Sequence, residues 1–210
     1  MRAILFDWDG TIVDSIQALF ETDAAICSTI GVPFDESIFR RTFSPNWRLM
    51  YRSLGIPEAR TDEAVAVWAA TYQPDRTEAF PGIAASLARL ACAGFTLGIV
   101  TGGSRVEIEP QLARLSLDGL LTVRVYGHDT TAGKPEPQPL QLALTMVGAG
   151  PNEAVYVGDA LDDMRMAAAA GVRGVGIVSM LAQAAELVAA GAAESAGSVV
   201  EWVDRFLGAG

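Results

Sequence analysis

The sequence predicts an α/β fold in which a Rossmann-like parallel sheet is flanked by helices and carries a small inserted all-helical domain. Short apolar runs alternate with segments of helical periodicity, as parallel strands buried between helices do. Acidic, hydroxyl and lysine side chains follow the ends of these runs, where open α/β sheets bind ligands. The helical stretch 15–79 separates the first run from the second and is far longer than an ordinary connection.

The chain begins with an expected strand, Ala3–Phe6, and the helical insertion follows it directly. Turns that contain Gly and Pro divide the insertion into four helices. We therefore predict a core domain, residues 1–14 and 80–210, and a helical cap domain, residues 15–79. The expected cap helices are Ile16–Ile30, Glu36–Thr42, Asn46–Leu54 and Asp62–Tyr72.

The remainder of the core alternates between helix and strand, and this order favours a parallel sheet. The expected strands are Phe95–Val100, Thr122–Tyr126, Ala154–Val157 and Val172–Val178. The expected helices are Ile83–Ala93, Arg105–Leu115, Pro139–Val147, Asp162–Ala170, Ala182–Ala189 and Ser198–Leu207.

The composition of the chain excludes several classes of function. Its 210 residues include 15 Lys and Arg against 25 Asp and Glu, a net charge of −10, which argues against nucleic acid or an anionic membrane as a partner. The only histidine is His128, so a His-rich metal site is excluded and any Ser-His-Asp triad would depend on this residue. Cys27 and Cys92 fit no disulfide framework, and we expect both to be buried. The sequence shows no signal-peptide pattern and no stretch suited to span a bilayer, so we expect a cytoplasmic protein.

The first candidate site follows the strand Ala3–Phe6, where Asp7 and Asp9 leave in the same direction. Two carboxylates this close are costly to hold unless a cation lies between them. One can act as a nucleophile and the other as a general acid and base. Gly10 permits a tight turn after them. An acidic loop that only caps a helix would show the same pattern.

Two later loops offer groups that can hold an anion. Thr101, Gly102 and Gly103 lie between a strand and a helix, where hydroxyl and backbone N–H groups form an anion site or an ordinary helix cap. The loop Gly133–Pro137 contains Lys134, the only lysine in the chain. Its ammonium group can neutralise a carboxylate or a phosphoryl oxygen, although loop lysines are commonly exposed to solvent.

A fourth group of candidate residues follows the strand Ala154–Val157. Asp159 leaves the strand, and Asp163 lies one helical turn later on the same face. Carboxylates placed like this near Asp7 supply the hard oxygen ligands that Mg²⁺ prefers.

The order of these motifs is DxD, a threonine in a strand-end loop, a lysine between Gly and Pro, and GDxxxD. This set resembles that of the haloacid dehalogenase superfamily of hydrolases, in particular its phosphoglycolate-phosphatase-like branch with a helical cap after the first motif. The resemblance covers the whole chain in order. Its cues are Phe6–Ser15, Gly133–Pro137 and Val157–Asp163, followed by Ala167–Gly171.

The resemblance implies a Mg²⁺-dependent phosphatase for a small organic phosphomonoester, with phosphoglycolate as the substrate by analogy. Asp7 would attack phosphorus and form an aspartyl-phosphate. Asp9 would protonate the leaving oxygen and then activate water. The implied phosphate-binding residues are Gly10, Thr101, Gly102, Gly103 and Lys134, and the last also balances the charge on Asp7. The implied Mg²⁺ ligands are Asp7, the carbonyl of Asp9, Asp159 and Asp163, the last of which would bind Mg²⁺ or brace Lys134.

The cap is expected to close over the phosphate site and to select the substrate. Several arginines lie near the start of its third helix, and we choose Arg48 as the residue that would bind a substrate carboxylate or second phosphate. A helix face that is only exposed to solvent would show the same arginines. The aromatic residues Trp47, Tyr51 and Trp68 are expected in the cap core. His128 is expected to lie in a loop near the site without acting as a base.

Other functions fit the same motifs. A sugar-phosphate mutase or a pyrophosphatase would use the same aspartyl-phosphate, and a catalytically silent protein would only bind phosphate. The expected partner is a small phosphorylated metabolite, with no nucleic acid and no membrane. The chain would act as a monomer or a homodimer.

Overall fold

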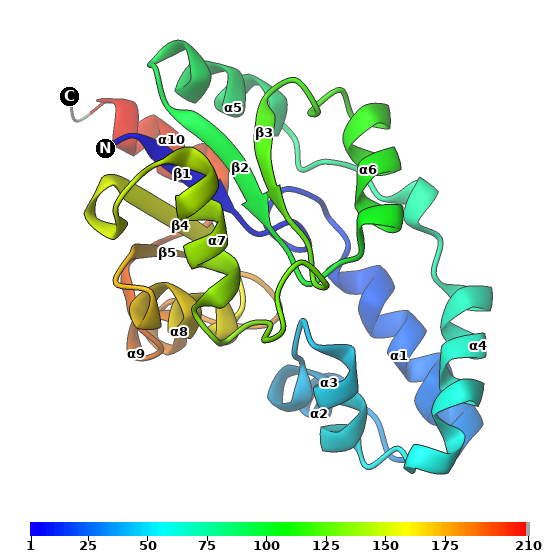
Figure 1. Ribbon diagram of the computed structural model, residues 1–210. Helices are drawn as coiled ribbons and strands as arrows, with labels where there is room; N and C mark the ends of the chain where they lie inside the picture. The colour runs from blue at the N-terminus through cyan, green and yellow to red at the C-terminus, as the bar shows by residue number, and fades with distance from the viewer. Residues whose placement is uncertain (209–210) are drawn as a thin grey trace.

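A single sheet of six parallel strands forms the centre of the computed structural model, which describes residues 1–208 (Figure 1). The strand order is β3-β2-β1-β4-β5-β6. This arrangement confirms the predicted Rossmann-like α/β class. The strands are β1 (Ala3–Phe6), β2 (Thr96–Val100), β3 (Leu121–Val125), β4 (Ala154–Gly158), β5 (Arg173–Ile177) and β6 (Ala192–Ala196).

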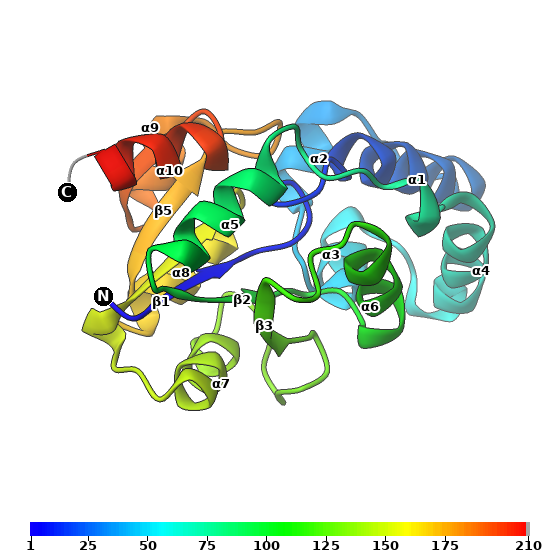
Figure 2. The same ribbon diagram turned by 90° about the horizontal axis from the view of Figure 1, so that it is seen from above.

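Both faces of the sheet are buried under helices. Side chains alternate along β1, so that Ile4 and Phe6 join one apolar cluster while Ala3 and Leu5 join the other. Helices α5 and α10 lie side by side on the first face (Figure 2). This face is covered by α5 (Ile83–Cys92), α6 (Arg105–Arg114) and α10 (Val199–Gly208), and the other by α7 (Gln138–Val147), α8 (Leu161–Ala169) and α9 (Ala184–Ala189).

The strand order reverses at β1, because β2 and β3 lie on one side of it and β4 to β6 on the other. In open parallel sheets such a reversal opens a crevice at the carboxyl ends of the two adjoining strands. Phe6 of β1 lies beside Val157 of β4, and the N–H of Asp7 donates to the carbonyl of Val157 at 2.8 Å. The residues that follow these two strands, Asp7 and Asp159, therefore meet at the crevice.

The stretch from Ile16 to Thr71, which follows β1, forms four α-helices that lie beside the carboxyl ends of the strands (Figure 1). Their apolar side chains form a third cluster, in which Phe39 is fully buried and which Ala160 and Leu181 of the core join. Gly31 ends the first helix in the left-handed conformation, with φ of +81°. We call residues 15–79 the cap. Its helices are α1 (Ile16–Ile30), α2 (Glu36–Thr42), α3 (Trp47–Leu54) and α4 (Thr61–Thr71).

Two expectations from the sequence are wrong. Strand β6, with the sequence AAESA, was not expected, because it lacks the β-branched and aromatic residues that mark strands. Cys92 is exposed at the end of α5, whereas Cys27 is buried in the cap as expected. The other elements begin and end within two residues of the predicted bounds. Among residues 1–208, no helix is both long and apolar enough to cross a membrane.

Candidate active site

The turn after β1 places two carboxyl groups in different surroundings. Asp7 is 6% exposed, and its Oδ1 lies 2.5 Å from Nζ of Lys134. Asp9 is half-buried, and its Oδ1 accepts a hydrogen bond of 2.6 Å from the hydroxyl of Ser15. Gly10 follows with φ of +73°, and its N–H donates to the carbonyl of Val13. This closed turn fixes where both carboxyl groups point.

Lys134 lies between two carboxylates at the bottom of the crevice. Its Nζ is 2.5 Å from Oδ1 of Asp7 and 2.7 Å from Oδ1 of Asp163, and its side chain is 2% exposed. Burial disfavours the charged ammonium, but the charges of Asp163 and Asp7 outweigh it and raise the pKa of Lys134 above its ordinary value. The only lysine of the chain is therefore a buried cation and not a solvent-exposed loop residue.

Asp163 is held by groups on three sides. Besides Lys134, its Oδ1 lies 3.0 Å from the hydroxyl of Tyr156, which is equally close to the carbonyl of Val100. Its Oδ2 accepts the N–H of Ala160 at 3.0 Å. Because both oxygens already have donors, these contacts favour a role for Asp163 in bracing Lys134.

Asp159 is fully buried and lacks a comparable set of donors. Its Oδ1 lies 3.3 Å from the hydroxyl of Thr11, whereas no group of the described residues donates to its Oδ2. Burial, followed by the charges of Asp7 and Asp163, raises the pKa of Asp159 well above its ordinary value. Burial and Asp163 raise the pKa of Asp7 to about 7, although Lys134 acts in the opposite direction. The ionised form of this group of acids is strongly disfavoured unless a further cation is present.

The same acids fit a divalent cation. One carboxylate oxygen each from Asp7, Asp159 and Asp163 lie within 4.8 Å of one another, and oxygen is the ligand that Mg²⁺ prefers. Gly10 lets the turn approach this group, because a Cβ at this position would lie 2.3 Å from Oδ2 of Asp159. The carboxylate of Asp9 lies outside the group, so only its backbone carbonyl remains as the expected ligand.

The loop after β2 brings Thr101 to the opposite side of the crevice. Thr101 is buried, and its Oγ1 accepts the N–H of Gly103 at 3.0 Å. Helix α6 is capped by other residues, Ser104 and Glu107, which form a reciprocal capping box. Thr101 is therefore not the helix cap that the sequence left as an alternative.

Gly102 lies directly against the cap. A Cβ at this glycine would be 2.6 Å from Cβ of Pro45 and 2.7 Å from its carbonyl oxygen. The loop between α2 and α3 thus rests on the loop after β2. Ser44 adds a hydrogen bond of 3.3 Å to Asp162 of α8, and Arg40 forms an ion pair of 3.0 Å with Glu186 of α9.

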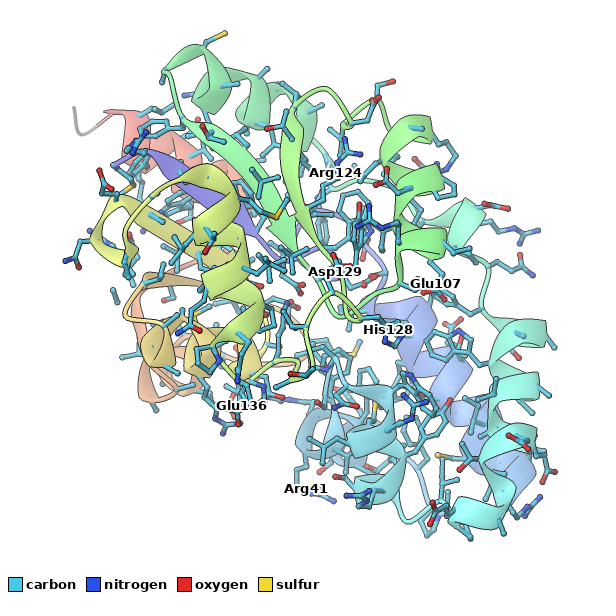
Figure 3. All side chains as sticks on the ribbon, viewed as in Figure 1. Arg41, Glu107, Arg124, His128, Asp129 and Glu136 are labelled. Carbon is cyan, nitrogen blue, oxygen red and sulfur yellow. The ribbon has the colours of Figure 1, made fainter. Side chains whose placement is uncertain are left out.

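A cavity of about 340 Å³ lies between the core and the cap. Its core side holds Asp7, Asp9 and Thr101, and its cap side holds Asp23 of α1 together with several aromatic rings. Glu107 and His128 also line it, and both lie on the side of the core that faces the cap (Figure 3). Arg48 is not among the described lining residues. Its side chain is exposed, and its guanidinium lies 4.4 Å from the ring centroid of Trp47, which lines the cavity, so the substrate contact of Arg48 stays a prediction.

The comparison with known families agrees with this geometry. Residues 4–177 match the model of the haloacid dehalogenase-like hydrolases, and this range includes the acids after β1 and β4, Thr101 and Lys134. The chain belongs to this family.

Members of the family with assigned activities match most of the chain. A phosphoglycolate phosphatase of Yersinia pestis is 29% identical over 187 residues, which cover 84% of this chain and 81% of the relative. An N-acetylmuramic acid 6-phosphate phosphatase of Pseudomonas aeruginosa is 30% identical and covers 82% of this chain and 80% of the relative.

Solved structures share the fold of this chain. A hydrolase from Pseudomonas syringae superposes with a TM-score of 0.87 at 23% identity and covers 99% of both chains. A haloacid dehalogenase-like protein from Streptococcus pneumoniae gives a TM-score of 0.82 at 22% identity, over 98% of both chains.

Three residues of the site escaped the sequence analysis. Ser15 and Tyr156 donate hydrogen bonds to Asp9 and Asp163, six and seven residues away in the sequence, and no helix or strand periodicity marks such contacts. Asp23 did leave a signal. It occupies a position on the apolar face of α1, between Leu19 and Ile26, where a charged residue is out of place.

Proposed function

We propose that the chain is a Mg²⁺-dependent phosphatase that hydrolyses small organic phosphomonoesters through an aspartyl-phosphate on Asp7. The observation that carries this proposal is the meeting of Asp7, Asp159 and Lys134 beneath a cavity that Asp9 and Thr101 also line. Phosphoryl transfer needs mainly positioning and the neutralisation of charge, and these residues offer both. The family relatives named as phosphatases support the same reaction class.

Asp7 is the proposed nucleophile. Its carboxylate would form a bond to phosphorus while the bond from phosphorus to the leaving oxygen breaks. The second half of the reaction transfers the phosphoryl group from Asp7 to water and releases inorganic phosphate. Lys134 stays bound beside Asp7 throughout and offsets the negative charge of the transferred group.

Asp9 is the proposed general acid and base. It would donate a proton to the leaving oxygen in the first half of the reaction and accept one from water in the second. Its hydrogen bond to Ser15 holds the carboxyl at the wall of the cavity that Asp7 also lines. The hydroxyl of Thr101 and the backbone of Gly102 and Gly103 would hold the phosphoryl oxygens, beside the turn at Gly10.

Mg²⁺ would be held by Asp7, Asp159 and the carbonyl of Asp9, while Asp163 braces Lys134. When bound, Mg²⁺ supplies positive charge next to the phosphoryl group and allows these acids to stay ionised. We further propose that the cap, residues 15–79, covers this site and that the core comprises residues 1–14 and 80–210. The substrate is a small phosphorylated metabolite, for which phosphoglycolate is the analogy offered by the relatives.

The nucleophile can be tested with p-nitrophenyl phosphate. The parent protein should release p-nitrophenol with Mg²⁺ and lose this activity with excess EDTA. Asp7→Asn should lose it even with Mg²⁺, because an amide cannot attack phosphorus. Equal rates for Asp7→Asn and the parent would exclude the proposed nucleophile, and no activity in the parent would favour the silent phosphate-binding protein.

Asp9 can be tested by rapid mixing with the same substrate. p-Nitrophenolate leaves without needing a proton, so Asp9→Asn should still form the aspartyl-phosphate but hydrolyse it slowly. We expect a burst of p-nitrophenol close to one equivalent of protein, followed by a slow steady state. A proportional loss of burst and steady state would contradict the proposed role. Conversion of glucose 1-phosphate to glucose 6-phosphate without phosphate release would instead identify a mutase.

A further inference from the structure

The cap side of the cavity contains a carboxyl group that the proposed reaction does not use. Asp23 of α1 is 3% exposed and lines the cavity, and none of the described residues donates a hydrogen bond to its Oδ1. Burial raises the pKa of Asp23 to about 7. Burying a carboxyl group without a hydrogen-bond donor costs free energy of folding. The position of this carboxyl at a cavity wall therefore points to a ligand that supplies the missing partner.

Aromatic rings from two cap helices share this part of the cavity. Trp47 and Tyr51 of α3 lie edge to face with centroids 5.3 Å apart, and Trp68 and Tyr72 at the end of α4 lie 4.8 Å apart. The faces of such rings attract cations, Trp most strongly. The Trp47 ring already binds one cation in this structure, the guanidinium of Arg48.

The formal charges around the cavity favour the same kind of ligand. Asp7, Asp9, Asp23 and Glu107 line it, whereas none of the described lining residues is Lys or Arg. Among the described lining residues, His128 alone has a basic side chain. Lys134 lies below the cavity and is already paired with two carboxylates. A second anionic group on the substrate would therefore face Asp23, and the cap contributes no Lys or Arg to the described lining of the cavity.

We propose that the cap side of the cavity binds an ammonium group between Asp23 and the rings of Trp47, Tyr51, Trp68 and Tyr72. The preferred substrates are then phosphomonoesters of amino alcohols, with the phosphoryl group at Asp7 and Thr101 and the alkylammonium group at Asp23. This inference rests on the proposed phosphatase function and narrows its substrate class. It sets this chain apart from the relatives above, whose named substrates carry a carboxylic acid.

A pair of substrates with the same shape isolates the charge. Choline phosphate and 3,3-dimethylbutyl phosphate differ only in that a carbon replaces the quaternary nitrogen. The parent should hydrolyse choline phosphate with a kcat/KM at least about tenfold higher than that of the neutral analogue. It should also prefer choline phosphate to phosphoglycolate. A ratio near one for the matched pair, or a preference for phosphoglycolate, would overturn the proposal.

Asp23→Asn tests the carboxyl itself. The ratio of the two kcat/KM values should fall to within about twofold of one, because the amide keeps the shape but not the charge. Both substrates are measured with the same protein sample, so a loss of folded or active protein lowers both kcat/KM values equally and leaves their ratio unchanged. Glu21→Gln is the matched control, since Glu21 lies on the same helix but is exposed, and it should keep the parent ratio. An unchanged ratio in Asp23→Asn would overturn the assignment of Asp23.

Binding without turnover separates this inference from the proposed reaction. Tetramethylammonium should quench tryptophan fluorescence of the parent in a saturable way without Mg²⁺, since Trp47 and Trp68 line the proposed site. Asp23→Asn should show a weaker or absent saturable change. No saturable change in the parent would overturn the ammonium site. If the parent binds tetramethylammonium but hydrolyses no phosphomonoester, the proposed phosphatase function fails while the ammonium site stands.

Discussion

Lys134 is the side chain on which the charge balance of the site depends. It is buried between Asp7 and Asp163, and a third acid, Asp159, lies next to them. An ion pair buried this deeply adds little net stability, but removing one partner leaves an uncompensated charge. The surrounding hydrogen bonds of Asp163 fix where the ammonium group can lie.

We expect Lys134→Met to lower the free energy of unfolding by roughly 3–5 kcal/mol without Mg²⁺, because Asp7 and Asp163 then lose their buried cation. Urea denaturation in EDTA would measure this loss. The double variant Lys134→Met/Asp163→Asn should recover part of it, since one of the two uncompensated acids is gone. A double variant that is less stable than Lys134→Met would contradict the charge argument.

Gly10 offers a second test at the level of one residue. Gly10→Ala would place a Cβ 2.3 Å from Oδ2 of Asp159, so the turn or the carboxylate must move. We expect kcat with p-nitrophenyl phosphate to fall on the order of 10²-fold. Gly31→Ala is the control, because Gly31 has a similar φ of +81° but no atom within 4 Å of the added Cβ. It should lose about 1 kcal/mol of stability and keep its kcat, and an equal loss of kcat in both variants would show that only backbone strain matters.

The motif residues could be predicted from the sequence because each follows an apolar run directly, and parallel strands bring their carboxyl ends to one edge of the sheet. The partners of these residues could not. Ser15 and Tyr156 reach Asp9 and Asp163 across six and seven residues of chain, and the strand and helix patterns do not specify the turns between them. Arg48 was chosen for its charge alone, and its guanidinium lies over the ring of Trp47, which itself lines the cavity.

At the level of helices and strands, β6 was not predicted because its formation also depends on contacts that its own sequence does not indicate. Its residues have little intrinsic preference for a strand, and it forms because backbone groups of β5 pair with it at the edge of the sheet. The cap helices were predictable since apolar periodicity and Gly or Pro turns mark their bounds. How they rest on the core depends on single close contacts, above all that between Gly102 and Pro45.

We expect Gly102→Ala to push the loop between α2 and α3 away from the loop after β2. Because the cap then closes less well over the cavity, kcat/KM with p-nitrophenyl phosphate should fall by at least about tenfold, mainly through a higher KM. Gly119→Ala is the control, because an added Cβ there meets nothing within 4 Å and Gly119 has no positive φ. An unchanged KM in Gly102→Ala would show that this contact does not position the cap.

For the molecule as a whole, we expect the free energy of unfolding to depend on pH through an acid at the cavity between the cap and the core. Among residues 1–208, Asp23 in the cap is the one buried acid that does not belong to the motifs. Its titratable neighbours are Tyr51 and Cys27, whose own pKa values are raised, that of the Cys27 thiol to about 11. Between pH 5 and 8, Asp23 is therefore the member of this group that changes its charge.

The folded protein should hold a proton on Asp23 up to a pKa of about 7, whereas the unfolded chain releases it near pH 4. Between these values the folded state binds more protons, so rising pH destabilises it. From pH 5 to 8, the parent should lose up to about 3 kcal/mol of unfolding free energy relative to Asp23→Asn. Urea denaturation at several pH values measures this difference. Glu21→Gln, which removes an exposed acid from the same helix, should run parallel to the parent. A constant difference between Asp23→Asn and the parent would mean that Asp23 is already ionised at pH 5 in the folded protein, and that cap and core tolerate its charge without a partner.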